Sequence, residues 1–268
     1  MGRIVLFLIG LLLMASGVMA AIIQVGPGQT YTTIQAAVNA ASAGDEIQVA
    51  AGTYTEAITI PIGKALTITG ANAGVAAGNN PGVRGAETII DGGIRLLSAS
   101  TINGISIQNG IQLGSFKYGV SVEADGATVI NCIVTNVPNE GGIVTLTNID
   151  NFTLTNSTIQ NNYRGIYFNP GGGHSLTGNL IDANNGAGVG IGSDGLSNFT
   201  MTGNTISNHT VEGWGASGVG TNVVAEGNSF LNNGVSVAHY GGNAIDASPN
   251  YWNGSPSTSG TVTNDPWW

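Results

Sequence analysis

The sequence predicts an all-β fold: a single-stranded right-handed parallel β-helix of roughly eight or nine coils with an N-terminal capping helix. Two repeating patterns and a local alternation of apolar and polar residues carry this prediction. The composition agrees with it, because 43 of the 268 residues are glycine. Glycine and asparagine accept the left-handed backbone angles that the tight turns of such a fold require.

The first pattern is an asparagine, once replaced by serine, two residues before an apolar side chain. Its members are Asn103, Asn131, Ser157, Asn179, Asn204, Asn228 and Asn250, which follow one another at 22 to 28 residues. The second pattern is a glycine directly before an apolar residue. Its members are Gly119, Gly142, Gly165, Gly188, Gly213 and Gly234, at 21 to 25 residues. Two patterns with nearly the same period predict that each period forms one coil of a solenoid.

Between these positions, apolar and polar residues alternate, as in Phe152-Thr-Leu154-Thr and Phe199-Thr-Met201-Thr. Alternation with a period of two indicates short strands with one buried face. A single coil cannot bury its own apolar face, so stacked coils must form a continuous core. We expect the coils to lie between Glu46 and Asn250, within a β-helix region that spans residues 46–268.

Both ends of such a core need a cover. Ile34, Ala37, Val38 and Ala41 have helical spacing, with Thr32 or Thr33 as the N-cap and Gly44 beyond the end. We therefore predict an N-terminal cap over residues 21–45 that contains a short helix. At the other end, the aromatic residues are candidate lids rather than ligand-binding groups. They are Trp252, Trp267 and Trp268.

Residues 1–20 have the pattern of a signal peptide. Arg3 precedes the apolar run from Ile4 to Met14, and Val18-Met19-Ala20 provides a cleavage site. The alternative is a membrane anchor, but the apolar run is shorter than the roughly 20 residues that span a bilayer. We expect the mature chain to be extracellular or at the cell surface, with the periplasm as an alternative, and free of the membrane after cleavage.

The charge balance limits the classes of partner. Six Lys and Arg face 15 Asp and Glu, giving a net charge of −9, so nucleic acid and anionic membranes are not expected partners. The same surplus argues against a polyanionic substrate unless Ca²⁺ or another cation bridges it. Cys132 is the only cysteine, so no intramolecular disulfide can form. We expect a monomer without a cofactor.

Several segments near the N-terminus carry a family resemblance. Tyr31-Thr-Thr-Ile-Gln-Ala-Ala-Val, Gly44-Asp-Glu-Ile-Gln-Val, Gly52-Thr-Tyr-Thr-Glu56 and Leu66-Thr-Ile-Thr-Gly70 resemble the N-terminal cap of pectin-lyase-like β-helix proteins. The end of the chain, from Asn250-Tyr-Trp-Asn-Gly254 onward, resembles the terminal coil of bacterial and archaeal surface β-helix proteins. The resemblance implies the fold but does not specify a particular activity, because lyases, hydrolases, esterases and adhesins all have this fold.

The catalytic motifs that the resemblance would imply are missing from the sequence. The paired acids of polygalacturonase-like hydrolases do not occur, and Gly173-His174-Ser175 lacks acids beside its histidine. The Asp and Arg contexts of methylesterase-like enzymes and the Asp cluster of pectate-lyase-like enzymes are also absent. The sequence therefore identifies no catalytic residue and leaves open whether the protein is an enzyme; it predicts no metal site, with Ca²⁺ implied only if the protein is a lyase.

Stacking brings equivalent positions of different coils into one column, which predicts a surface cluster beside the glycine pattern. Its candidate binding residues are Lys117, Tyr118, Glu140, Tyr163, Arg164, Tyr167 and Glu212. Asn233 falls in the same column as Glu212, and Tyr167 should point outward beside Ser121 and Val144. Aromatic faces with nearby charges suit a sugar. The alternatives are solvent-facing ion pairs of little energetic value and acid–base hydrolysis by Glu140 and Glu212.

A second surface consists of Thr-x-Thr pairs that should face outward on three coils, at Thr153-Leu-Thr155, Ser175-Leu-Thr177 and Thr200-Met-Thr202. Such an array either binds ice or reflects the ordinary β-preference of threonine. The sequence thus predicts a secreted or surface β-helix that engages polysaccharide, by binding rather than cleaving. The alternatives are a divergent polysaccharide lyase or glycoside hydrolase, and a structural or adhesive module, with ice binding as a special case.

Overall fold

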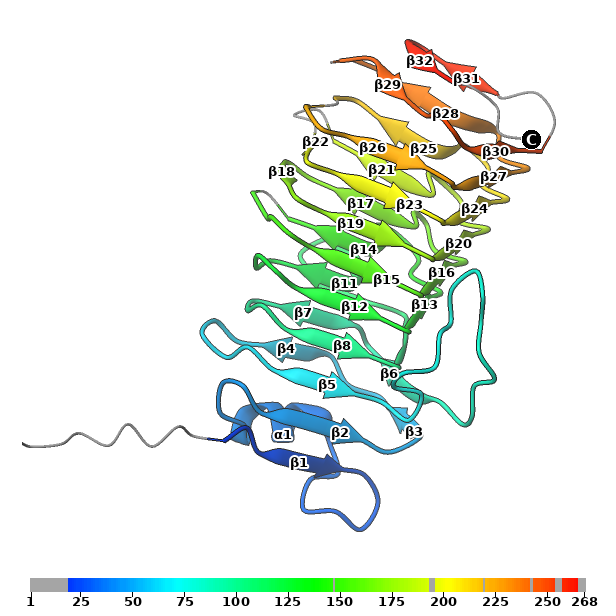
Figure 1. The fold of residues 1–268 in the computed structure, drawn as a ribbon. Helices are drawn as coiled ribbons and strands as arrows, with labels where there is room; N and C mark the ends of the chain where they lie inside the picture. The colour runs from blue at the N-terminus through cyan, green and yellow to red at the C-terminus, as the bar shows by residue number, and fades with distance from the viewer. Residues whose placement is uncertain are drawn as a thin grey trace, which may run out of the picture.

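The computed structural model describes residues 19–146, 148–192, 196–218, 220–241, 243–253 and 257–264. It confirms the predicted fold, a right-handed parallel β-helix (Figure 1). The solenoid has about ten turns, slightly more than predicted. The difference arises at the ends, because strand β1 (Ile22–Val25) stacks before Glu46 and strand β32 (Val262–Thr263) lies beyond Asn250.

Three long sheets form the sides of the solenoid, and neighbours within each sheet are parallel except for one hairpin. The first sheet contains β1, β2 (Glu46–Val49), β5 (Thr67–Thr69), β8 (Thr101–Asn103), β12 (Thr128–Ile130), β15 (Thr153–Thr155), β19 (Ser175–Thr177), β23 (Thr200–Thr202) and β26 (Val224–Glu226). The second contains β3 (Gly52–Tyr54), β6 (Thr88–Asp91), β9 (Ser106–Gln108), β13 (Ile133–Thr135), β16 (Thr158–Gln160), β20 (Leu180–Asp182), β24 (Thr205–Ser207), β27 (Ser229–Leu231) and β30 (Tyr251–Trp252).

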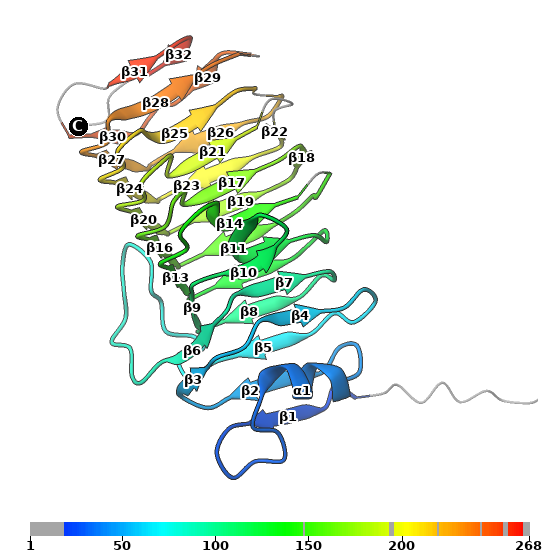
Figure 2. The same ribbon diagram turned by 180° about the vertical axis from the view of Figure 1, so that it is seen from behind.

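The third sheet is the one that carries the candidate site. It contains β4 (Ile58–Ile60), β7 (Ile94–Leu96), β11 (Phe116–Val122), β14 (Gly141–Thr145), β17 (Ile166–Phe168), β21 (Val189–Ile191), β25 (Glu212–Ala216), β28 (Val235–His239) and β31 (Thr258–Ser259). Strand β10 (Ile111–Leu113) pairs antiparallel with β11, and this hairpin stands out from the sheet (Figure 2). Two short pairs complete the fold, β18 (Gly171–Gly172) with β22 (Leu196–Ser197) and β29 (Ile245–Asp246) with β32.

The core is a set of aliphatic and aromatic columns inside the solenoid. In the first sheet, each strand turns its middle residue inward, and the registers align these residues from turn to turn. The column consists of Ile47, Ile68, Ile102, Val129, Leu154, Leu176, Met201 and Ala225, all buried. Burial of these side chains drives the stacking, since no turn can shield its own apolar face.

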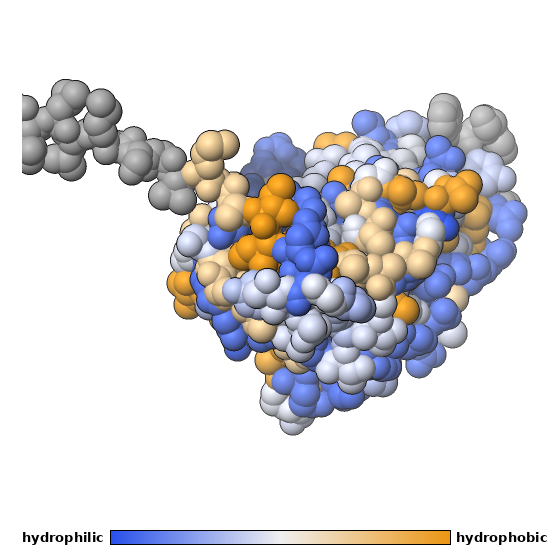
Figure 3. All heavy atoms as spheres, turned by 90° about the horizontal axis from the view of Figure 1, so that it is seen from below, coloured by the Kyte–Doolittle hydropathy of each residue, from blue (hydrophilic) through white to orange (hydrophobic). Residues whose placement is uncertain are grey.

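Helix α1 (Ile34–Ala40) packs at the N-terminal end, where the sequence predicts it. Thr33 is the N-cap, but its side chain makes no capping hydrogen bond. The Glu56 carboxylate takes that role, because it accepts hydrogen bonds from the backbone N–H groups of Ile34 (2.7 Å) and Gln35 (2.9 Å). The surface at this end shows apolar patches beside polar side chains (Figure 3).

At the other end, Trp252 is buried and stacks on Phe230 of the preceding turn, with ring centroids 5.0 Å apart. Trp267 and Trp268, the other two candidate lids, lie outside the described residues, as do residues 1–18 of the predicted signal peptide. In the part of the chain that the structure covers, no helix is long and apolar enough to cross a membrane.

The asparagine pattern forms a buried hydrogen-bonded ladder between the first and second sheets. Its members from the sixth turn onward are Ser157, Asn179, Asn204, Asn228 and Asn250. The backbone N–H of each donates to the side-chain oxygen of the next at 2.8–3.0 Å. Asn103 and Asn131 were wrongly aligned with this ladder. Register places Ile105 and Cys132 at the equivalent positions, because Ile133 pairs with both Ser106 and Thr158.

A second ladder, which the sequence did not reveal, lies between the second and third sheets. The side chains of Asn162, Asn184, His209 and Asn233 each accept a backbone N–H from the turn before. The Nδ1 atom of His174 likewise accepts a hydrogen bond from the backbone N–H of Phe152, at 3.1 Å. His174 and His209 are therefore buried turn residues, and burial lowers the pKa of His174 to about 4. Burial also lowers the pKa of His209.

The glycine pattern marks places where neighbouring turns leave no room for a side chain. A Cβ on Gly142 would lie 2.8 Å from the carbonyl oxygen of Gly165, and one on Gly165 would lie 2.4 Å from that of Gly188. Gly234 does not belong to the pattern, because Glu212 pairs with Val235 and so places Ser236 beside Gly213. This shift moves the following residues of the turn by two positions.

A long loop (71–87) leaves the third turn and runs along the edge of the solenoid (Figure 2). The N–H groups of Ala77 and Gly78 donate to the carbonyl of Asn156, both at 2.9 Å. Farther along the solenoid, the Asn79 side chain donates to the carbonyl of Gly203. Arg84 donates to the carbonyl of Asn131 at 2.8 Å and pairs with a glutamate of the loop. The loop therefore connects turns that are far apart in the stack.

Candidate functional site

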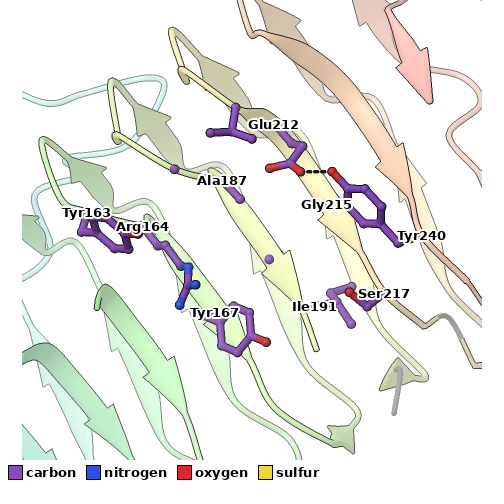
Figure 4. Close-up of a pocket in the computed structure, with 12 residues that line it drawn as sticks. Tyr163, Arg164, Tyr167, Ala187, Ile191, Glu212, Gly215, Ser217 and Tyr240 are labelled. Carbon is purple, nitrogen blue, oxygen red and sulfur yellow. Dashed lines mark hydrogen bonds between the residues drawn. The ribbon is translucent and has the colours of Figure 1, made fainter. Parts of the chain in front are cut away.

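A groove of about 350 Å³ lies on the outer face of the third sheet (Figure 4). We call it the third-sheet groove and define it by its lining residues. These are Tyr163, Arg164, Tyr167, Gly186, Ala187, Gly190, Ile191, Val211, Glu212, Gly215, Ser217 and Tyr240. They come from four successive turns, so the groove exists only because the coils stack in register.

Two glycines form the floor of the groove. The strand registers align Tyr167 with Gly190, Gly190 with Gly215, and Gly215 with Ala238 in one outward-facing column. Outward side chains are therefore missing on β21 and β25, which exposes the flat backbone there. The Tyr167 ring leans over this floor, since a Cβ on Gly190 would lie 2.8 Å from it.

Arg164 and two tyrosines form the wall toward the N-terminus. The guanidinium carbon lies 5.0 Å from the ring centroid of Tyr167 and 5.6 Å from that of Tyr163. Nη1 of Arg164 donates to the Glu140 carboxylate at 2.7 Å, which makes an ion pair. The stacking and the ion pair together hold the guanidinium in one place and neutralise its charge.

Glu212 and Tyr240 form the opposite wall. The Tyr240 hydroxyl donates a hydrogen bond to the carboxylate of Glu212, which is buried to all but 8% of its surface. This hydrogen bond, then burial, raises the pKa of Tyr240 to about 12. The Tyr240 residue remains 62% exposed, so its side chain is accessible to a ligand. Ala187 lies between Arg164 and Glu212 in the same column.

The structure brings together four of the predicted binding residues, since Tyr163, Arg164, Tyr167 and Glu212 all line the groove. Glu140 lies just outside and reaches it through its ion pair with Arg164. The predicted register of Tyr167 beside Val144 and Ser121 is confirmed.

The other predicted residues lie elsewhere. Tyr118 does not line the groove but packs with Ile111 and Val144 in a small apolar cluster, against which Tyr167 lies. Lys117 belongs to the hairpin of β10 and β11, where its backbone N–H donates to Asn139. The expectation that Asn233 follows Glu212 in the column was wrong, because Val235 occupies that place.

Sequence reasoning missed Tyr240 and the two floor glycines. Gly190 and Gly215 each lie two residues after a member of the glycine pattern. The spacing could therefore have predicted two outward-facing positions without a side chain. Tyr240 could not be predicted in this way, because the shift at Gly234 breaks the count of residues between Glu212 and the following turn.

The residues present do not fit a calcium cluster of the pectate-lyase kind. Among the residues that the structure describes, no group of three or more His, Cys, Asp or Glu side chains is placed to hold a metal ion. Glu212 is the one carboxylate among the described residues that line the groove. Glu140 lies three turns from it, roughly 14 Å at the usual strand spacing, whereas paired glycosidase carboxylates lie about 5–9.5 Å apart.

Comparisons with known proteins agree with this architecture. The family model described as "Right handed beta helix region" matches residues 92–251. A comparison with curated protein sequences gave no match. A pectin methylesterase from Aspergillus niger, solved in a penultimately deglycosylated form, has 15% identity and a TM-score of 0.49, over 92% of this chain and 86% of that one.

The pectate lyase Pel9A has 14% identity and a TM-score of 0.51, over 93% of this chain and 79% of the lyase. At this identity the likeness shows the fold alone, which is the pectin-lyase-like parallel β-helix that the N-terminal motifs predict. Because the family model spans more than half of the sequence, the chain belongs to the right-handed β-helix family.

Proposed function

We propose that this protein is exported as a monomer, by cleavage of residues 1–20, and binds polysaccharide in the third-sheet groove. The observation that carries the proposal is the bare floor of Gly190 and Gly215 between the rings of Tyr167 and Tyr240. Flat backbone between two aromatic walls accepts the flat faces of sugar rings, while charged groups at the walls bind the hydroxyls.

The dimensions support a short segment of a glycan chain. Tyr167 and Tyr240 lie three turns apart, roughly 14 Å at the usual strand spacing. A groove of this length and of about 350 Å³ suits two or three sugar units. It is open along the surface, so a longer polysaccharide would continue past both walls.

Binding is favoured over cleavage because the two carboxylates at the walls each have a hydrogen-bond partner and lie far from each other. Arg164 pairs with Glu140, and Glu212 accepts the Tyr240 hydroxyl. The wide separation of the two carboxylates leaves no acid–base pair around one glycosidic bond. A divergent lyase or hydrolase would need such a pair or a metal cluster, and the groove supplies neither from its lining residues.

A binding screen of the mature chain, residues 21–268, against plant, algal and bacterial polysaccharides tests the proposal. We expect retention on at least one glycan, with no unsaturated products and no new reducing ends. Tyr167→Ala should weaken that binding at least tenfold through the loss of stacking. Tyr251→Ala, which removes an exposed tyrosine of the second sheet, is the matched control. Product formation, or equal binding by both variants, would contradict the proposal.

A hydroxyl-bearing face on the first sheet supports an adhesive role as a second candidate. One column contains Thr67, Thr101, Thr128, Thr153, Ser175 and Thr200. This column extends over six turns rather than the three that the sequence indicates. The neighbouring column is less regular, because Asn103 and Ile130 interrupt it. Ice binding would appear as thermal hysteresis that Thr155→Leu and Thr177→Leu abolish; its absence would leave the groove as the functional surface.

A further inference from the structure

We infer that the third-sheet groove selects a polysaccharide segment that carries protonated amino sugars and rejects one that carries uronates. The inference rests on the proposed function, since it concerns which glycan the same groove binds. Its basis is the difference in charge between the two walls: one is neutralised by an ion pair and the other is not.

The arginine wall carries no net charge. The Arg164 guanidinium is paired with Glu140 at 2.7 Å, and its face lies against Tyr167. A sugar carboxylate would have to displace Glu140 to gain a comparable ion pair. Arg164 therefore acts as a stacked, neutralised group rather than as an anion receptor.

The opposite wall carries an uncompensated negative charge. Within the described parts of the chain, no Lys, Arg or His lies within ion-pair distance of Glu212. Its hydrogen-bond partner, the Tyr240 hydroxyl, is a neutral donor. A carboxylate has about four acceptor sites on its two oxygens, so one phenol leaves acceptor capacity for a ligand.

Because the Glu212 carboxylate is buried, its charge discriminates between cationic and anionic ligands. Only 8% of the Glu212 surface is exposed, and its side chain lies 3.3 Å from the position of a Cβ on Gly215. A ligand on the glycine floor therefore meets the carboxylate with little water between them. In such surroundings an ammonium group, with three N–H donors, is attracted strongly and a second carboxylate is repelled. The chain's net charge of −9 acts in the same direction at longer range.

A comparison of matched tetrasaccharides tests the inference by calorimetry. The probes are a β-1,4-linked glucosamine tetramer, the β-1,4-linked glucose tetramer and a galacturonate tetramer, at a pH where the amines are protonated. We expect the glucosamine tetramer to bind about tenfold more tightly than the glucose tetramer, as one charge-assisted hydrogen bond provides, and the galacturonate tetramer to bind least.

The decisive variant is Glu212→Gln, which keeps the side-chain size and an acceptor for the Tyr240 hydroxyl. It should remove the tenfold preference for the glucosamine tetramer over the glucose tetramer. Glu226→Gln removes the same charge from an exposed position on the first sheet and should leave the preference intact.

The outcomes separate this inference from the proposed function. Equal binding of the glucosamine and glucose tetramers, or tightest binding of the galacturonate tetramer, would overturn the selection and leave glycan binding standing. A preference that survives Glu212→Gln would also overturn it. Failure of every probe, with the polysaccharide screen negative as well, would overturn the proposed function itself.

Discussion

The hydroxyl of Tyr240 donates a hydrogen bond to the carboxylate of Glu212 on the preceding turn of the solenoid. This contact joins two successive turns on the outer face of the third sheet. It fixes the aromatic ring and the negative charge of one groove wall relative to each other. A ligand therefore meets a preformed wall, which lowers the entropy lost on binding.

Removal of that hydroxyl gives the first prediction. In the wild-type protein the Glu212 carboxylate raises the pKa of Tyr240 to about 12. A raised pKa means that this contact stabilises the fold at pH below about 10 and is lost as the pH rises through 12. Tyr240→Phe should remove the last tyrosinate to appear in an alkaline absorbance titration. Tyr251→Phe, an exposed tyrosine outside the groove, is the control, and loss of the same late step there would refute the assignment.

Filling the floor of the groove should block binding without unfolding the protein. Gly215→Val places a branched side chain on β25, where strand propensity favours it. Its Cβ would lie 3.3 Å from the Glu212 side chain, so a small adjustment suffices. We expect at least a tenfold loss of glycan affinity with the thermal midpoint nearly unchanged. Gly85→Val in the long loop is the comparison, and it should bind like the wild type; an unaffected Gly215→Val would show that the ligand lies elsewhere.

Breaking the asparagine ladder should destabilise the whole stack. Asn204 donates to the carbonyl of Leu176 and to Asn228, and accepts the N–H of Asn179, all within the core. Asn204→Ala removes the side-chain partner of the Leu176 carbonyl and of the Asn179 N–H, which costs about 3 kcal/mol of unfolding free energy. Chemical denaturation followed by circular dichroism measures the loss. Asn253→Ala, on the surface, should change stability little, and similar losses in both variants would argue against the ladder.

His174 should make the fold sensitive to acid. Burial lowers its pKa from 6.5 to about 4, although Asp150 and Asp125 act in the opposite direction. The unfolded chain thus binds a proton more readily, so stability is full above pH 6.5 and falls as the pH drops toward 4, by about 3 kcal/mol. His174→Asn keeps a side-chain acceptor for Phe152 but cannot titrate.

The measurement for this variant is the thermal midpoint between pH 4 and pH 7. We expect a shallower dependence on pH than in the wild type, whatever the absolute stability, because the loss of the imidazole also removes its stacking on Phe168. His209 remains, and its lowered pKa leaves part of the slope. Identical slopes in the two proteins would show that His174 does not control the acid response.

The periodic features of the sequence were sufficient for the fold. Spaced asparagines and glycines, with alternation between them, specify turns and buried faces directly, so the solenoid and helix α1 were predictable. Register was harder to predict. Asn131 carries the expected letter but lies in the left-handed turn position (φ 55°), one residue before the ladder position that Cys132 occupies. Asparagine occupies both the left-handed turn position and the adjacent ladder position. Only the pairing of the strands distinguishes the two positions.

The candidate site was predictable in part for the same reason. Arg164 lies one residue before Gly165 of the glycine pattern and Tyr167 two residues after it. Their positions on the third sheet could therefore be predicted from the spacing. Tyr240 lies beyond the shift at Gly234, and its contact with Glu212 depends on how two turns of different length align. The ion pair of Arg164 with Glu140 depends on side-chain conformations across turns, which spacing does not specify.

The long loop has a consequence for how this solenoid can evolve. Repeat proteins gain and lose coils by duplication and deletion, because each coil contacts only its neighbours. Here Ala77 contacts Asn156 and Asn79 contacts Gly203, although the loop belongs to a turn that lies several coils closer to the N-terminus. Loss of one coil in between would move these partners by about 4.8 Å and break the contacts. The loop therefore sets the number of coils between its own turn and the turn of Gly203, a turn that also lines the groove.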